Sequence, residues 1–245
     1  MKSLTKILLI AALLGGASYT YAKPVNNTKT YAPYDIQDRH LSGFHAVEAA
    51  GSFDVYITQG STESVKVDAP ADVMDRVVTE VIHGSLKIRN KHNNGGDWSW
   101  TGRKKIVVYV TVRDIDAIAI SGSGDVYFKD GIHASHLSIS VNGSGDVFGK
   151  VDTKDLACDV SGSGNIKLSG HAETSSVSVS GSGDYSAHEV STSNTSVQVS
   201  GSGNANINAS NSITAEVSGS GDVRYTGGAS HVVKNKSGSG DISGN

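Results

Sequence analysis

The stretch "SGSGDVYF" at residues 121–128 decides the fold. Closely similar words follow six more times, and the first Gly of each copy stands at position 122, 143, 162, 181, 201, 219 or 238. Successive copies are therefore 18–21 residues apart. A flexible linker has no reason to keep such a period, whereas a fixed period near 20 residues is typical of stacked repeat proteins. The stretch thus predicts the corner of a repeated structural unit.

Apolar residues alternate with polar ones in the runs that precede the corners. Because side chains along a strand point to opposite faces in turn, each run contributes two inward side chains. The two inward columns are Ile118, Ile139, Cys158, Val177, Val197 and Ala215, and Ile120, Val141, Val160, Val179, Val199 and Val217. A third apolar column restarts after the corners, at Val126, Val147, Ile166, Tyr185, Ala205, Val223 and Ile242. Each coil is therefore expected to run through a strand, a corner, a second strand and a polar return.

Each corner consists of two glycines around a small residue, followed by Asp or Asn. Gly adopts positive φ without strain, and Asp and Asn side chains bond nearby backbone amides in turns. One coil cannot bury its apolar side alone, so the coils must stack on one another. The sequence therefore predicts an all-β protein, a parallel β-solenoid (β-helix) with Gly-Ser-Gly-Asx corners and coils of about 19 residues over residues 116–245.

A less regular, β-rich half precedes these repeats, over residues 40–115. The run "VEAAGSFDVYI" from Val47 has the form of a degenerate coil in which Phe53 replaces the second Gly. Further strands are expected, with His83-Gly84 as a hairpin turn. The run "ADVMDRV" from Ala71 is consistent with one or two helical turns.

The first 22 residues have the pattern of a signal peptide, with Lys2 and Lys6 before an apolar stretch too short to span a bilayer comfortably. Residues 23–39 are expected to form an exposed leader. No second long apolar segment follows, so we expect an exported chain without a transmembrane segment. Residues 1–22 hold two lysines and no acid, so their removal changes the net charge from −3 to −5. This balance argues against nucleic acid and anionic membranes as partners, because both require a basic surface.

Several of these segments together resemble a known bacterial family, the putative auto-transporter adhesin head GIN domain. They are "GFHAVEAAGSFDVYITQG", "LKIRN", "KKIVVYVTV", the successive corners, and the ending "DVRYTGGASHVVKNKSGSGDI". The resemblance covers residues 40–245 and implies an exported, all-β, solenoid-like domain. It brings no catalytic residues with it. The chain ends four residues after Asp241, without the strands of a membrane barrel, so we expect no self-translocation.

The residue after each corner forms a column of Asp and Asn, which has two interpretations. The carboxylates Asp125, Asp146, Asp184 and Asp222 are candidate calcium ligands, since oxygen donors suit a hard cation. The alternative is that each Asp or Asn caps its turn and forms a ladder with its neighbours. The motif occurs only once per coil, so the opposite side of a calcium site lacks it, and we favour the ladder.

Trp98 and Trp100 are the candidate recognition residues. Both lie in the Gly-rich segment 93–105 between two expected strands, and they share a face if this segment is extended. Exposed Trp side chains stack on sugars or anchor partners. The alternative is that they cover the end of the solenoid or an exposed edge.

Metal and catalytic sites receive little support from the sequence. His133 and His136 are three residues apart, but we expect no acid or Cys near them at matching repeat positions. His171, His188 and His231 occupy different offsets in their coils, so no zinc site is predicted. Cys158, the single cysteine, has the place of a small buried residue and allows no internal disulfide.

These features together favour an exported, non-enzymatic adhesin-like or envelope-interaction module, in the periplasm or at the cell surface. We expect no cofactor. The expected partners are a polysaccharide or a cell-envelope protein, and a second copy of the chain is a candidate at the end of the solenoid. The alternatives are a periplasmic structural or stress-associated scaffold without adhesive role and, less favoured, a carbohydrate-active enzyme. Catalysis by paired carboxylates requires a cleft, and short coils leave little room for one.

Overall fold

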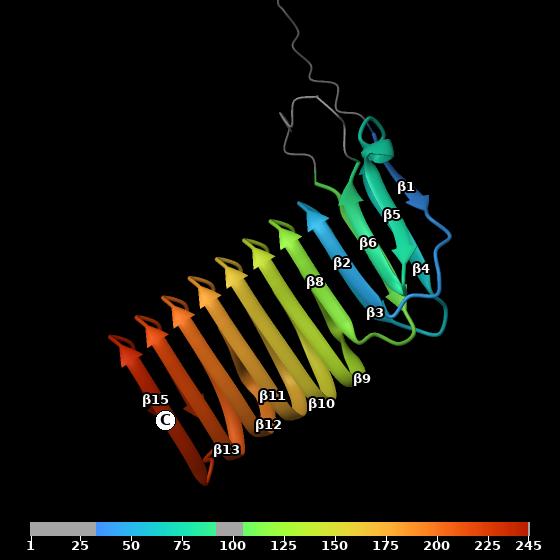
Figure 1. Ribbon diagram of the computed structural model, residues 1–245. Coiled ribbons are helices and arrows are strands. Elements are labelled where there is room, and N and C mark those ends of the chain that lie inside the picture. The colour runs from blue at the N-terminus through green and yellow to red at the C-terminus, as the bar shows by residue number, and fades with distance from the viewer. Residues whose placement is uncertain (1–32, 92–104, 245) are drawn as a thin grey trace, which may run out of the picture. The chain divides into compact units, whose positions relative to one another are not determined.

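The computed structural model describes residues 33–91 and 105–244, and strands dominate this part of the chain (Figure 1). The expected signal peptide and most of the expected leader lie outside the described residues. The strands of the N-terminal half are β1 (Tyr34–Asp38), β2 (Ala46–Gly51), β3 (Asp54–Gln59), β4 (Ser64–Pro70), β5 (Val77–Ile82), β6 (Ser85–Asn90) and β7 (Val107–Val112). The strands of the repeats are β8 (Ala117–Gly122), β9 (Val126–Gly143), β10 (Val147–Gly162), β11 (Ile166–Gly181), β12 (Tyr185–Gly201), β13 (Ala205–Gly219), β14 (Val223–Thr226), β15 (His231–Gly238) and β16 (Ile242–Gly244).

Helical structure is limited to one 3-10 turn, η1 (Met74–Arg76), in the described residues. The segment that was consistent with one or two helical turns therefore forms a single short one. None of the helical structure described between residues 33 and 244 is long and apolar enough to cross a membrane.

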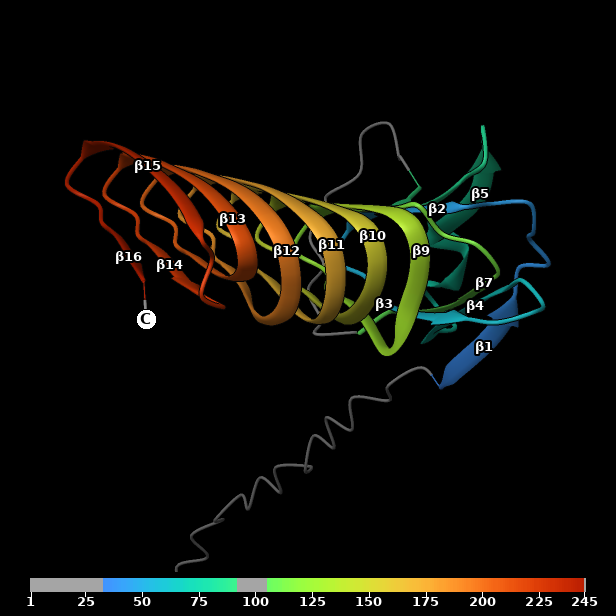
Figure 2. The same ribbon diagram turned by 90° about the horizontal axis from the view of Figure 1, so that it is seen from below.

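The repeats form the predicted parallel β-solenoid. Strands β9 to β13 each pair in parallel with the next, and the first Gly of one corner lies opposite the first Gly of the following corner. Each of these strands is 15–18 residues long and curves round the core, as Figure 2 shows. The polar returns belong to these strands rather than to separate loops. The return of β10 pairs almost fully with that of β11, whereas those of β12 and β13 pair only in part.

The predicted inward columns form the core. Every member of the column that runs from Ile120 to Val217 is at most 1% exposed. Tyr185 is the largest buried side chain of the third column, and its hydroxyl bonds to Cys158 and Ser175 inside the coil. Full burial of a Val side chain contributes roughly 1.5 kcal/mol or more, so the stack of coils supplies the stability that one coil lacks.

Close backbone contact explains the glycines at the corners. A Cβ added at Gly183 would lie 2.0 Å from the carbonyl oxygen of Gly164 in the coil below. The first Gly of the same corner, Gly181, has φ of +117°. The degenerate coil has Phe53 in the second position, as expected from the sequence, and this side chain is buried, with its ring over Gly51.

The N-terminal half stacks in an order that differs from its order in the sequence. Strand β2 lies between β6 and β8, and β3 lies between β7 and β9, with parallel pairing throughout. The outermost parallel layer consists of β6 and β7. These strands come later in the chain than β2 and β3, the strands on which they stack, and Figure 1 shows β8, β2 and β6 side by side in this order. The hairpin at His83-Gly84 joins β5 to β6 and has positive φ at both residues, as predicted.

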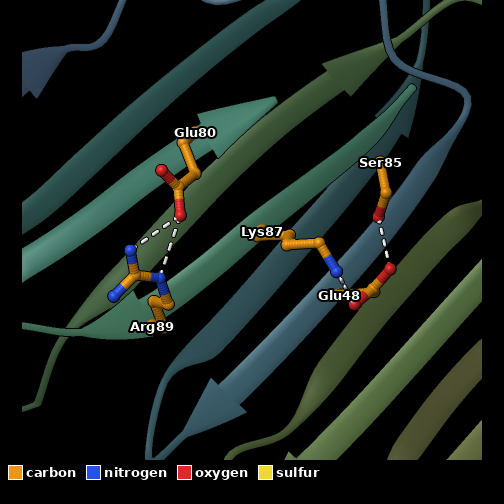
Figure 3. Close-up of polar contacts among 5 residues, drawn as sticks. All are labelled: Glu48, Glu80, Ser85, Lys87 and Arg89. Atoms are coloured by element: carbon orange, nitrogen blue, oxygen red, sulfur yellow. Dashed lines mark hydrogen bonds and ion pairs between the residues drawn. The ribbon is translucent and has the colours of Figure 1, made fainter. Parts of the chain in front are cut away.

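Three antiparallel strands close this end, and we call β1, β4 and β5 the N-terminal cap. Strand β4 pairs with β7, β1 pairs with β4, and β5 pairs with β6. Arg89 on β6 donates two hydrogen bonds to one oxygen of Glu80 on β5, at 2.9 and 2.8 Å (Figure 3). Glu48 accepts from Ser85 at 2.7 Å and from Lys87 at 2.6 Å. These contacts tie the cap to β6, and β6 to β2.

The opposite end consists of β14, β15 and β16. Strand β15 pairs with β13, β16 pairs with β14, and every residue of β15 is exposed. The inward positions that hold Ala215 and Val217 in the coil before are occupied here by Lys234 and Lys236. The Lys234 ammonium donates to the carbonyl of Ile242 at 3.1 Å and lies 4.8 Å from the centre of the Tyr225 ring. The N-terminal half thus covers the far end of the stack and not this one.

Candidate functional site

The Asp and Asn residues after the corners form a hydrogen-bonded ladder. The Oδ1 atom of each accepts from the backbone N–H of its counterpart one coil later, at 2.8–3.1 Å, from Asp125 to Asp241. Asn165 also donates its side-chain N–H to Asp146, and Asn204 does the same to Asp184. Each Asn therefore lowers the repulsion between the acids around it.

Two places in this ladder have Asp directly on Asp, and a further donor is present at each. The hydroxyl of Tyr127 donates to Asp125 at 3.1 Å, and Arg224 donates to Asp222 at 3.0 Å. No group of three or more His, Cys, Asp or Glu side chains suited to a metal occurs in residues 33–91 and 105–244. The ladder accounts for the Asp or Asn that follows every corner, and the calcium interpretation of Asp125, Asp146, Asp184 and Asp222 stays a prediction.

The tryptophans and the cysteine that were candidates in the sequence lie in different parts of the chain. Trp98 and Trp100 lie outside the described residues. Cys158 is 1% exposed in the inward column, and burial raises the pKa of its thiol to about 12. A thiol with so high a pKa is almost wholly protonated at neutral pH, and the thiolate is the reactive form. Its position suits packing.

The expected surroundings of His133 and His136 are wrong. His133 lies opposite Asp152 and His136 opposite Asp155, and their Nδ1 atoms are 3.1 and 2.8 Å from the carboxylates. The reason is an insertion in β9, where three residues, 129–131, stand opposite the single Lys150. The two His–Asp pairs align when residues of β9 and β10 are counted backwards from the following corner, at Gly143 and Gly162, and not when they are counted forwards from the preceding one. All four side chains are exposed, so the pairs contribute little to stability.

A shallow groove of about 490 Å³ crosses β9 to β13 in the segment before the corners. One wall is a column that contains His, Asp and Asn beside hydroxyl residues, and the other is a column of Ser, Ala and Thr alone. The first column is His136, Asp155, Thr174, Asn194 and Ser212, and the second is Ser138, Ala157, Ser176, Ser196 and Thr214. Since neighbouring strands lie about 4.8 Å apart, the groove offers similar chemistry at that interval along its length.

The two walls differ in how their polar groups are used. In the first column, Thr174 donates to Asp155 at 2.7 Å and Ser212 donates to Asn194 at 2.8 Å. In the second column, the hydroxyls of Ser138, Ser176, Ser196 and Thr214 have no hydrogen-bond partner in the part of the chain that the structure describes. The groove therefore presents a row of free hydroxyls across several coils.

An aromatic ladder that was not predicted from the sequence lies on another face. Tyr109, Tyr56, Tyr127 and Phe148 stack in that order, with ring centroids 5.6, 4.9 and 5.4 Å apart. Burial raises the pKa of Tyr127 to about 12, and its hydrogen bond to Asp125 adds to the shift. Three of the rings stand two residues after the corner Asp, a signal visible in the aligned repeats. Tyr109 carries no such signal, because β7 stacks out of chain order.

Comparisons with known proteins agree with this architecture. A crystal structure of a putative adhesin from Bacteroides fragilis matches with a TM-score of 0.79 and 22% identity, covering 87% of this chain and 97% of that one. Two structures from Parabacteroides distasonis are also similar. They are a putative adhesin (TM-score 0.69, 21% identity, 87% and 98% covered) and a putative lipid binding protein (0.68, 21%, 86% and 96%). At such identities the likeness shows the fold alone.

No curated protein matches the chain. The family model described as "Putative auto-transporter adhesin, head GIN domain" matches residues 43–229, which is most of the chain. The chain therefore belongs to the family of the putative auto-transporter adhesin head, the GIN domain.

Proposed function

We propose that this protein is an exported, non-enzymatic adhesin-like module that contacts a polysaccharide along the groove. The observation that carries the proposal is the column of free hydroxyls at Ser138, Ser176, Ser196 and Thr214, on β9, β11, β12 and β13, which is interrupted on β10 by Ala157. Hydroxyls both donate and accept hydrogen bonds, as sugar hydroxyls do, so the two surfaces match chemically. A linear polymer laid across the coils makes the same weak contact several times, and repeated contacts raise the overall affinity.

Membership of an adhesin-named family supports this role. The shape of the groove is also in favour, because an open groove admits an internal segment of a long chain, whereas an enclosed pocket suits a small ligand. The described polar columns are flat and repetitive, which suits holding a polymer in place.

Blocking the groove tests the proposal. The Ser196→Tyr variant places a large ring on the exposed wall without touching the core, and Ser200→Tyr is the matched control on the same strand, four residues away. We expect binding to neutral polysaccharides on a glycan array to fall at least tenfold in Ser196→Tyr and to stay unchanged in the control. Equal binding by both variants, or none by the wild-type protein, would overturn the groove as a polysaccharide site.

The alternative of a periplasmic scaffold makes a different prediction about location. An adhesive role requires the protein at the cell surface, where an antibody reaches it on intact cells. Labelling that appears only after the outer membrane is permeabilised would favour the scaffold.

A further inference from the structure

A second hollow lies at the end of the aromatic ladder, on strands β9 to β12. It encloses about 310 Å³ and has no lining residue in common with the groove. Phe148 and Leu168 supply its apolar surface, and Lys129, Lys150 and Lys167 supply its charge. Its volume falls at the lower end of the range for small-molecule sites.

The hollow exists because two strand irregularities meet there. The pairing of β10 with β9 shifts between Gly149 and Val151, and the pairing of β11 with β12 shifts between Lys167 and Ser169. Gly149 is required at the first shift, since a Cβ at this position would lie 1.9 Å from the Phe128 ring. Bulges of this kind redirect side chains and are enriched at functional sites.

The charges around the hollow are not neutralised. None of the three lysines forms an ion pair with a carboxylate in the described chain. The ammonium of Lys129 lies 5.8 Å from the centre of the Tyr127 ring. Glu189 is the one acid that lines the hollow, and its carboxylate lies 3.6 Å from His188. A net positive hollow thus stands out on a chain whose net charge is −3.

We propose that this hollow, which we call the lysine pocket, binds a carboxylated sugar unit of an acidic polysaccharide. The lysine ammoniums match the carboxylate, and the half-buried Phe148 ring offers an apolar surface to the C–H groups of a pyranose. An inorganic anion is too small to use both features. Nucleic acid requires a basic stripe, and three lysines in one hollow do not form one.

Titration calorimetry with trigalacturonic acid tests the lysine pocket, with maltotriose as the neutral probe and inorganic phosphate as the small anion. We expect the acidic trimer to bind, to bind more weakly as salt is added, and to bind much more tightly than either control. The double variant Lys150→Gln/Lys167→Gln should lose roughly tenfold in affinity, because it removes two of the three positive charges of the lining.

Two single variants sharpen the result. Lys154→Gln, on β10 but outside the pocket, should leave the affinity unchanged. Glu189→Gln should raise the affinity about threefold, because it removes the one negative charge of the lining. The proposal fails if the acidic trimer does not bind, if phosphate binds equally well, or if Lys154→Gln weakens binding as much as the pocket variants. The groove variant Ser196→Tyr should bind the trimer normally, so failure here is distinguishable from failure of the polysaccharide groove.

Discussion

The two ends of the solenoid face the same physical problem and solve it differently. At the N-terminal end, the antiparallel strands of the cap pair with the last parallel layer and bury apolar residues such as Val65 and Val67. At the C-terminal end, no described strand covers β15 or β16. Lysines stand there at positions that are apolar in every coil before, Lys234 and Lys236.

An exposed strand edge is a template for pairing with another chain, and inward-pointing charge is one of the known protections. A further coil stacked on β15 would bury two ammonium groups with no carboxylate beside them, which is costly. One end is therefore closed by added strands and the other by charge. This difference shows two ways of protecting the end of a β-stack, which are pairing with added strands and a last described coil that departs from the inward apolar pattern.

The largest effect is expected in the N-terminal half, at the corner between β2 and β3. Phe53 is buried there in the position that is Gly in the other corners of the stack, so Phe53→Ala leaves a cavity beneath the outermost parallel layer. We expect a loss of about 3–5 kcal/mol in the free energy of unfolding, measured by urea denaturation. Tyr225→Ala, at the half-buried aromatic of the open end, is the control and should cost clearly less. Equal losses would mean that the two ends are equally packed.

A smaller effect separates a central corner from the terminal one. An added Cβ at Gly183 lies 2.0 Å from the carbonyl oxygen of Gly164, and one at Gly240 lies 1.9 Å from that of Gly221. Coils on both sides hold Gly183 in place, so Gly183→Ala should cost about 1–3 kcal/mol. Gly240 has no described coil beyond it and can shift outward, so Gly240→Ala should cost less than about 1 kcal/mol in the same measurement. Similar costs would show that the last coil is as rigid as the central ones.

The regular half of the fold follows from local sequence, since each coil repeats the same inward residues and the same corner. Columns aligned on the corner glycines predict the core directly, and the ladder that was favoured for the Asp and Asn residues is confirmed by their Oδ1 contacts. The stacking order of β6, β2 and β8, in contrast, could not be predicted from the sequence. It depends on pairing between segments far apart in the chain, and no repeat marks which layer lies outside.

The surface features were less predictable for a related reason. The pairs His133–Asp152 and His136–Asp155 depend on the insertion at residues 129–131, which shifts the pairing within a coil. The lysine pocket depends on the same shift, and on Gly149, whose role becomes apparent only when the Phe128 ring is placed. Local irregularities that leave the period almost unchanged thus decide where the candidate sites lie.

Replacing the lysines at the C-terminal end of the solenoid should promote self-association of the protein. Lys234→Ala/Lys236→Val restores the residues that Ala215 and Val217 provide one coil earlier, and removes the cost of burying two ammoniums. We expect the self-association constant of the protein to rise about tenfold or more, measured by analytical ultracentrifugation, which corresponds to about 1.4 kcal/mol. Lys154→Val is the control for loss of a surface lysine. A wild-type protein that already dimerises through β15 would contradict the role of these lysines.

The smallest effect concerns the polar contacts between β6 and β2. Hydrogen bonds from Lys87 and Ser85 lower the pKa of the Glu48 carboxyl from its ordinary value of 4.5. A lowered pKa in the folded state stabilises the protein above pH 4.5, and this contribution is lost as the pH falls through the folded-state pKa. Glu48→Gln should therefore cost less than about 1 kcal/mol at pH 7, and the gap to the wild-type protein should narrow below pH 4.5. Glu216→Gln, at an exposed acid near the open end, is the control, and a pH-dependent gap of the same size there would show that the effect is not specific to this contact.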